Sequence, residues 1–248
     1  MNKGITMKII VTGIGPGHEA GMTPEALAAL EECDVLVGYH VYTDLVRHLC
    51  PGKEVMTTGM TKETDRCRMA LEVALQGKTV AFVCSGDAGV YGMAGIMMEV
   101  AAEHPEVEIT VVPGVTAACF AAALLGAPLI HDFAVISLSD LLTPWEKIEK
   151  RLRLAAEADF VICLYNPRSK KRHDYLHKAV DYVLEHRLKD TPCGFVKNAG
   201  RDGEEKHYCT LEVLAEQDID MFTTIIIGNS QTKMVNGRMV TPRGYRGL

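Results

Sequence analysis

Short apolar runs alternate with helical patterns along most of this chain, and that alternation restricts the fold more than any other feature. Lys8–Val11 and Thr79–Cys84 are runs of the kind found in buried strands. Thr23-Pro24 signals a helix start, because threonine caps a first turn and proline suits the first helical position. Repeated strand–helix units predict mostly parallel sheets with ligand loops at the carboxyl ends of the strands. The sequence therefore predicts an α/β fold.

The break between two halves falls after residue 113, beside a Pro-Gly pair. The second half opens with a helical pattern over Ala117–Leu125, and its end has a more antiparallel character. We therefore expect two α/β domains, residues 1–113 and 114–248. The segment Lys233–Leu248 is rich in Gly, Arg and Pro and is expected to be irregular.

Composition argues against several classes of protein. The 26 Lys and Arg against 32 Asp and Glu give a net charge of −6, without the basic excess of a nucleic-acid binder. The longest apolar run, Ala117–Ile130, is interrupted by Gly126 and Pro128, so no membrane span is expected. The N-terminus does not resemble a secretory signal, which favours a cytoplasmic location. The 8 cysteines are spaced singly, so we predict reduced, mostly buried thiols and no protein metal site.

Three glycine-rich loops each follow a predicted strand: Gly13–Gly17, Ser85–Gly92 and Pro113–Ala117. Glycine allows a ligand to approach the backbone closely. The first loop is not a dinucleotide fingerprint, because that motif needs glycine where His18 stands and an acid after the second strand. Taken singly, Asp87 or Thr116 could simply cap the helix that follows.

Together and in this order, the loops resemble those of the tetrapyrrole methylases, which carry G-x-G-P-G, G-D-x-x-x-Y/F-G and P-G-[VI]-[TS]-[AS] motifs. Further strings look like those of precorrin-3B C(17)-methyltransferases. They are Gly38-Tyr39, Gly59-Met60, Ser137–Trp145, Leu164–Pro167, Gly228–Thr232 and Thr241–Tyr245. The resemblance implies S-adenosylmethionine as methyl donor, bound in the cleft between two α/β domains, and a homodimer.

The same resemblance implies a role in cobalamin (vitamin B12) biosynthesis. The expected reaction is methylation of C-17 of precorrin-3B or cobalt-factor III, with contraction of the macrocycle. The family's cofactor-binding positions correspond here to Pro16, Ser85, Gly86, Asp87, Val90, Thr116, Ala117, Asn166 and Ala199.

The chemistry of such a reaction adds candidates of its own. Methyl transfer is an in-line displacement that depends on positioning and needs no nucleophilic side chain. Ring contraction also needs proton transfers, for which the candidate catalytic residues are His18, Asp87 and His131, with Asp140 a further possibility. A tetrapyrrole carries several carboxylates, and Arg66 and Lys170 are the basic residues predicted to bind them.

Other functions stay open at this point. One is a tetrapyrrole methylase that acts at a different ring position, such as C-11 of precorrin-4. Others are a family member that modifies RNA or protein, and a carrier that binds the cofactor or a corrinoid without turnover. The acidic composition argues against an RNA substrate. The sequence does not distinguish a cobalt-containing from a metal-free substrate.

Overall fold

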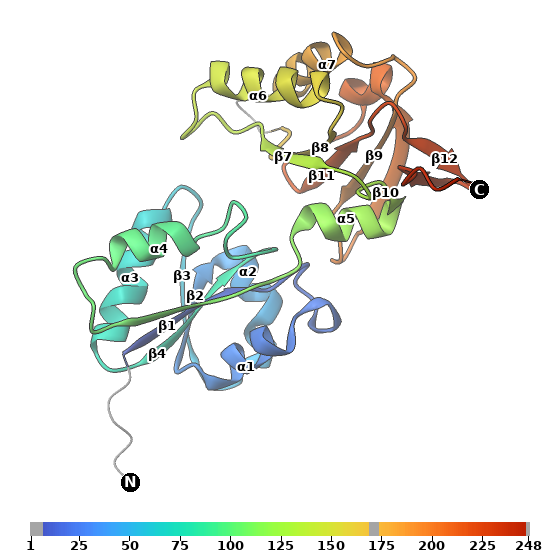
Figure 1. The fold of residues 1–248 in the computed structure, drawn as a ribbon. Coiled ribbons are helices and arrows are strands. Elements are labelled where there is room, and N and C mark those ends of the chain that lie inside the picture. The colour runs from blue at the N-terminus through green and yellow to red at the C-terminus, as the bar shows by residue number, and fades with distance from the viewer. Residues whose placement is uncertain (1–6, 169–173, 247–248) are drawn as a thin grey trace. The chain divides into compact units, whose positions relative to one another are not determined.

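A computed structural model describes residues 7–168 and 174–246. The chain divides into two compact units, Met1–Ala117 and Ala118–Leu248, and both are α/β (Figure 1). The sequence placed the domain boundary after residue 113, slightly before the division between these units. Among the described residues, no helix is long and apolar enough to cross a membrane.

The first unit is built on a fully parallel five-stranded sheet with the strand order β3-β2-β4-β1-β5. Its strands are β1 (Lys8–Gly13), β2 (Val35–Tyr39), β3 (Glu54–Thr58), β4 (Thr79–Cys84) and β5 (Glu108–Val112). Its helices are α1 (Pro24–Glu32), α2 (His40–Val46), α3 (Glu63–Leu75) and α4 (Ala94–Val100), with short 3-10 helices at Glu19–Gly21 and Arg47–Leu49. Because all strands run the same way, the loops that follow them share one edge of the sheet.

Helices cover both faces of this sheet (Figure 1). Successive side chains of a strand point to opposite faces, so Ile9 packs toward α3 and α4 whereas Ile10 packs toward α1 and α2. Both side chains are buried. The sheet therefore lies between two apolar layers, which explains why its central strands β2 and β4 are largely apolar.

The helix starts and ends follow local chemistry. The predicted start of α1 is confirmed: the Ala26 amide donates to Thr23 Oγ1 at 3.1 Å, and Pro24 is the first helical residue. The helix α4 ends at Val100. Pro105 follows closely, and a proline disfavours helical geometry in the residue before it.

The second unit contains a mixed sheet with the strand order β10-β9-β11-β8-β7. Its strands are β7 (Phe133–Ser137), β8 (Val161–Tyr165), β9 (Pro192–Lys197), β10 (Glu205–Thr210) and β11 (Thr223–Ile227). Its helices are α5 (Ala117–Leu125), α6 (Trp145–Glu157) and α7 (Tyr175–Leu184), with a 3-10 helix at Leu211–Glu216. The strands β7 and β8 are parallel, whereas β11 is antiparallel to both β8 and β9. The expected antiparallel character of this half is therefore confirmed.

The expectation that Lys233–Leu248 is irregular was wrong for residues 233–240, whereas residues 241–246 contain no helix or strand. The strands β12 (Lys233–Val235) and β13 (Arg238–Val240) form a hairpin, and β13 pairs with the short strand β6 (Gly126–Ala127). Asn236 and Gly237 form the turn with φ values of 49° and 73°. Asn-Gly is a strong signal for such a turn, because both central residues need positive φ.

The eight cysteines are free thiols, mostly buried, as the sequence predicted. Burial raises the pKa of the Cys33 thiol to about 11 and that of the Cys84 and Cys163 thiols to about 12. The reactive thiolate is therefore scarce in these groups at pH 8. Cys119 is the exposed exception.

We therefore expect iodoacetamide at pH 8 to label Cys119 rapidly in the folded protein, with all eight thiols labelled after denaturation. Peptide mass spectrometry at several time points checks this. Rapid labelling of Cys84 or Cys163 would contradict the burial described here.

Candidate active site

Two of the glycine-rich loops join directly at the carboxyl edge of the first unit. The Gly15 amide donates to the Gly86 carbonyl at 3.0 Å, and the Gly86 amide donates back to Gly15 at 2.8 Å. These loops follow β1 and β4, which are neighbours in the sheet and are followed by helices on opposite faces. Such a switch point in an open α/β sheet is where ligands commonly bind.

The third loop packs against the first two through glycine. A Cβ atom on Gly114 would lie 2.2 Å from the Gly86 carbonyl oxygen and 2.6 Å from that of Gly13. A Cβ atom on Gly13 would lie 2.7 Å from the Gly114 nitrogen. Gly86 also has a φ of +67°, a conformation that glycine adopts without strain. Direct backbone-to-backbone contact therefore requires glycine at positions 13 and 114, and the positive φ favours it at position 86.

Asp87 fastens the same loops through its carboxylate. Oδ1 accepts hydrogen bonds from the Gly89 and Val90 amides at 2.8 and 3.1 Å. Oδ2 accepts one from the Gly114 amide at 3.0 Å. One oxygen thus shapes the turn after β4 and the other ties that turn to the loop after β5. Both oxygens are already bound by amides, so this geometry gives no support to a proton-transfer role.

The other predicted residues of the first unit lie in these loops. Pro16 is buried, and His18 is exposed. A Cβ atom on Gly21 would lie 2.5 Å from Pro16 Cγ and 2.8 Å from His18 Cε1, so both side chains pack over Gly21. Val90, in the loop after β4, is 38% exposed.

The loops after β4 and β5 also approach each other closely. A Cβ atom on Gly86 would be 3.5 Å from the Ala117 nitrogen and 3.6 Å from Thr116 Cα. Ser85, Thr116 and Ala117 are half-buried. The structure thus brings together all the cofactor-binding residues predicted in this unit.

The second unit has a carboxyl edge of its own, where β7, β8 and β9 end. Asn166 follows β8 with a φ of 52°, and its Nδ2 donates to Ser137 Oγ at 2.9 Å. Ala199 follows β9, and the nearby Asn198 has a φ of 47°. The strand β11 lies between β8 and β9. Asn166 and Ala199, the two cofactor-binding residues predicted in this unit, therefore share one edge of its sheet.

Three other predicted residues stand apart from these groups. His131 precedes β7, so it lies at the opposite edge of the sheet from Asn166, and its Nε2 is 3.0 Å from the Pro242 carbonyl oxygen. Arg66 lies at the ends of β2 and β3 but is only 5% exposed. Lys170 falls outside the described residues.

An aromatic cluster in the second unit was missed by the sequence analysis. The Tyr175 hydroxyl donates to Asp140 Oδ2 at 2.5 Å, and this hydrogen bond raises the pKa of the hydroxyl above its ordinary value. The ring of Trp145 lies 4.2 Å from that of Tyr175. The string Ser137–Trp145 therefore folds onto α7 through both its acid and its tryptophan. No short-range sequence signal links Asp140 to Tyr175, because the helix α6 and the strand β8 separate them.

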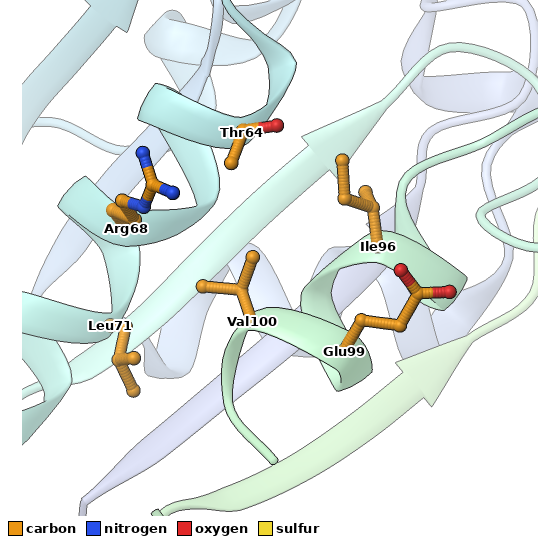
Figure 2. A pocket seen from close by; sticks show the side chains of 6 residues that line it. All are labelled: Thr64, Arg68, Leu71, Ile96, Glu99 and Val100. Atoms are coloured by element: carbon orange, nitrogen blue, oxygen red, sulfur yellow. The ribbon is translucent and has the colours of Figure 1, made fainter. Parts of the chain in front are cut away.

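A pocket of the first unit lies between α3 and α4 (Figure 2). Its lining residues are Thr64, Arg68, Leu71, Ile96, Glu99 and Val100. None of them is a predicted site residue. Among the described residues, no group of three or more His, Cys, Asp or Glu could hold a metal ion.

The chain is similar to proteins with curated names. A Salmonella typhimurium protein named probable cobalt-factor III C(17)-methyltransferase is 50% identical, over 95% of this chain and 98% of its own length. A Sinorhizobium protein named precorrin-3B C(17)-methyltransferase is 40% identical, over 98% of this chain and 99% of its own length. A Priestia megaterium cobalt-factor III methyltransferase is 46% identical over 96% of this chain, which spans only 45% of that longer protein.

Solved structures agree with this likeness. The methyltransferase CobJ superposes with a TM-score of 0.88 at 39% identity, over 94% of this chain and 99% of its own. The cobalt precorrin-4 methyltransferase CbiF superposes with a TM-score of 0.75 at 27% identity, over 90% of this chain and 95% of its own. A Thermus thermophilus uroporphyrin-III C-methyltransferase, solved with S-adenosylhomocysteine, superposes with a TM-score of 0.73 at 25% identity. The superposition covers 89% of this chain and 97% of that structure's chain.

The family model for tetrapyrrole (corrin/porphyrin) methylases matches residues 8–215 of this chain, which include the loops of both carboxyl edges. The chain therefore belongs to the tetrapyrrole methylases and is a methyltransferase.

Proposed function

We propose that this chain methylates C-17 of a corrin precursor with S-adenosylmethionine as donor, in cobalamin biosynthesis, and contracts the macrocycle as the family resemblance implies. The observation that carries the proposal is the near full-length likeness to C(17)-methyltransferases. Cobalt-factor III is the favoured substrate over precorrin-3B, because the relatives named for cobalt-factor III are more similar to this chain. The lower identity to the cobalt precorrin-4 enzyme argues against a C-11 reaction.

The residues present fit S-adenosylmethionine. The carboxyl edge of the first unit is lined by glycine and other small residues, so a ligand can lie against the backbone there. Val90 offers an exposed apolar side chain, and the amide of Asn166 and the backbone of Ala199 suit an adenosine. The cofactor supplies a sulfonium-bound methyl group. We propose as its binding residues Pro16, Ser85, Gly86, Asp87, Val90, Thr116, Ala117, Asn166 and Ala199.

The protein's own task in methyl transfer is to hold the acceptor carbon in line with the methyl group. We propose that Asp87 contributes by fixing the shape of the cofactor loops. Of the predicted acid–base residues, His18 is favoured for the proton transfers of ring contraction, because it is exposed and lies beside the first glycine-rich loop. His131 is disfavoured, because it lies at the opposite edge of its sheet from Asn166.

Anaerobic incubation of the protein and S-adenosylmethionine with cobalt-factor III, beside a parallel reaction with precorrin-3B, tests the proposal. Mass spectrometry should show one added methyl group and the absorption spectrum should change, faster with cobalt-factor III. Turnover of precorrin-3B alone would overturn the preference for the cobalt substrate. Turnover of neither substrate would overturn the proposal.

We also propose a homodimer, as the family resemblance implies, and a cytoplasmic location. The acidic composition supports a small-molecule substrate over a nucleic acid. Analytical ultracentrifugation tests the oligomeric state. Binding to RNA that weakens with salt would contradict the small-molecule assignment.

A further inference from the structure

Arg66 is a buried cation that the described part of the chain leaves without an anion. It lies in the first turn of α3 and is 5% exposed. Its Nε donates to Thr58 Oγ1 at 2.8 Å and its Nη2 to the Gly59 carbonyl at 2.9 Å, and both acceptors are neutral. Among the described residues, no ion pair includes Arg66, whereas the exposed Arg68 pairs with Asp65.

This arrangement is energetically unusual. Removing a charge from water costs several kcal/mol, which a nearby opposite charge normally offsets. The amino end of α3 adds to the cost, because a helix dipole is positive there. Arg187 shows the ordinary solution: its side chain is 4% exposed, and its Nη1 lies 2.8 Å from Asp159 Oδ1. The charge of Arg66 has no such offset, which points to an anion from outside the chain.

Arg66 lies under a rim of side chains at the carboxyl edge of the first unit. Its guanidinium carbon is 5.8 Å from the centre of the Tyr39 ring. That ring packs edge-on against Tyr42, with the ring centres 5.1 Å apart. Met60, two residues after the end of β3, is 46% exposed. This rim belongs to the ends of β2 and β3, and β2 pairs with β4, whose loop carries Asp87.

The turn that covers Arg66 is strained. Thr61 has a φ of 62°, which a β-branched residue rarely adopts. Such strain persists only where the surrounding structure enforces it, and it is concentrated at ligand sites. Aromatic and apolar side chains above a buried cation form a surface suited to a flat macrocycle that carries carboxylates.

We propose that Arg66 binds a carboxylate of the tetrapyrrole substrate, with Tyr39 and Met60 against the macrocycle. This inference rests on the proposed function and names part of its substrate site. Nη1 of Arg66 makes no hydrogen bond among the described residues, so it is the donor available to the ligand. The methionine carboxylate of the cofactor has the same chemistry, and binding measurements must separate the two sources.

The test compares Arg66→Met, Arg66→Lys and Arg68→Met in the full chain. We expect Arg66→Met to raise the dissociation constant for uroporphyrin III, used as a carboxylated tetrapyrrole probe, at least tenfold. S-adenosylmethionine affinity, measured by calorimetry, should change less than twofold. Arg66→Lys should recover part of the loss, because lysine keeps the charge but not the two-pronged geometry. Arg68→Met, the control at an exposed position, should bind both uroporphyrin III and S-adenosylmethionine as tightly as the wild type.

Thermal stability separates this proposal from a merely structural role. Arg66→Met removes a cation without leaving an orphaned carboxylate, so its unfolding temperature should not fall. Arg187→Met leaves Asp159 without its cationic partner and removes the donor to the Ala156 and Phe160 carbonyls, so its unfolding temperature should fall clearly. Lower stability of Arg66→Met with unchanged probe binding would overturn the proposal, as would a loss confined to S-adenosylmethionine or a wild type that does not bind the probe. The binding result does not need turnover, so it stays informative if the proposed reaction fails.

Discussion

Gly114→Ala should remove most of the affinity for S-adenosylmethionine and destabilise the first unit by about 3 kcal/mol, the upper part of the range for overpacking. The added Cβ atom would lie 2.2 Å from one backbone carbonyl oxygen and 2.6 Å from another. Neither oxygen can rotate away as a side chain would, so the loops after β1, β4 and β5 must separate. Thermal unfolding should begin roughly 10 °C lower, and calorimetry should show at least tenfold weaker cofactor binding.

Gly95→Ala is the matched control in the same unit. Gly95 lies in α4, and a Cβ atom there would meet nothing within 4 Å. Alanine favours a helix over glycine by about 1 kcal/mol, so this variant should be as stable as the wild type or more stable. Normal cofactor binding by Gly114→Ala would show that the contact between the three loops is not what organises the site.

Asp87→Ala should weaken S-adenosylmethionine binding by about 100-fold, because hydrogen bonds to a charged group contribute about 1.5–3 kcal/mol each. The substitution leaves the amides of Gly89, Val90 and Gly114 without their acceptor. Asp87→Asn keeps one oxygen as acceptor for the Gly89 and Val90 amides. Its NH2 group, however, faces the Gly114 amide, and both of these groups are donors. The affinity of Asp87→Asn for S-adenosylmethionine should therefore be about tenfold lower than that of the wild type, and higher than that of the alanine variant. Isothermal calorimetry measures all three proteins.

The dependence of the rate on pH distinguishes loop shaping from acid–base catalysis by Asp87. Loop shaping predicts that Asp87→Asn keeps the shape of the wild-type profile of kcat/KM against pH and mainly raises the KM for S-adenosylmethionine. A catalytic acid or base would give the opposite pattern, with unchanged cofactor affinity, a large fall in kcat and the loss of one limb of the profile. That outcome would restore the role predicted from the sequence.

Most of the fold could be predicted because its signals are local. A buried parallel strand reads as an apolar run, and the Thr23-Pro24 pair marks a helix start without reference to the rest of the chain. The three glycine-rich loops were found for the same reason. Why they need glycine could not be predicted, because the contact of Gly114 with Gly13 and Gly86 joins residues far apart in sequence.

The burial of a residue and its place on the sheet depend on the fold and cannot be predicted from the residue type. Arg66 and Arg68 look alike in sequence, yet their places on α3 leave one buried and the other exposed. His131 was a candidate by residue type alone, and only the direction of β7 reveals that it precedes the strand at the other edge. The hairpin at Asn236-Gly237, by contrast, has a local signal in the Asn-Gly pair, although the glycine and proline content of Lys233–Leu248 favours irregular structure.

The position of the transferred methyl group tests the central assignment most directly. The protein is incubated anaerobically with cobalt-factor III and S-adenosylmethionine labelled with carbon-13 in the methyl group, and the product is examined by two-dimensional NMR after removal of any paramagnetic species. We expect a single labelled methyl group whose long-range correlations place it on C-17 of a contracted ring. A labelled methyl group on C-11 or on any other ring carbon would contradict it.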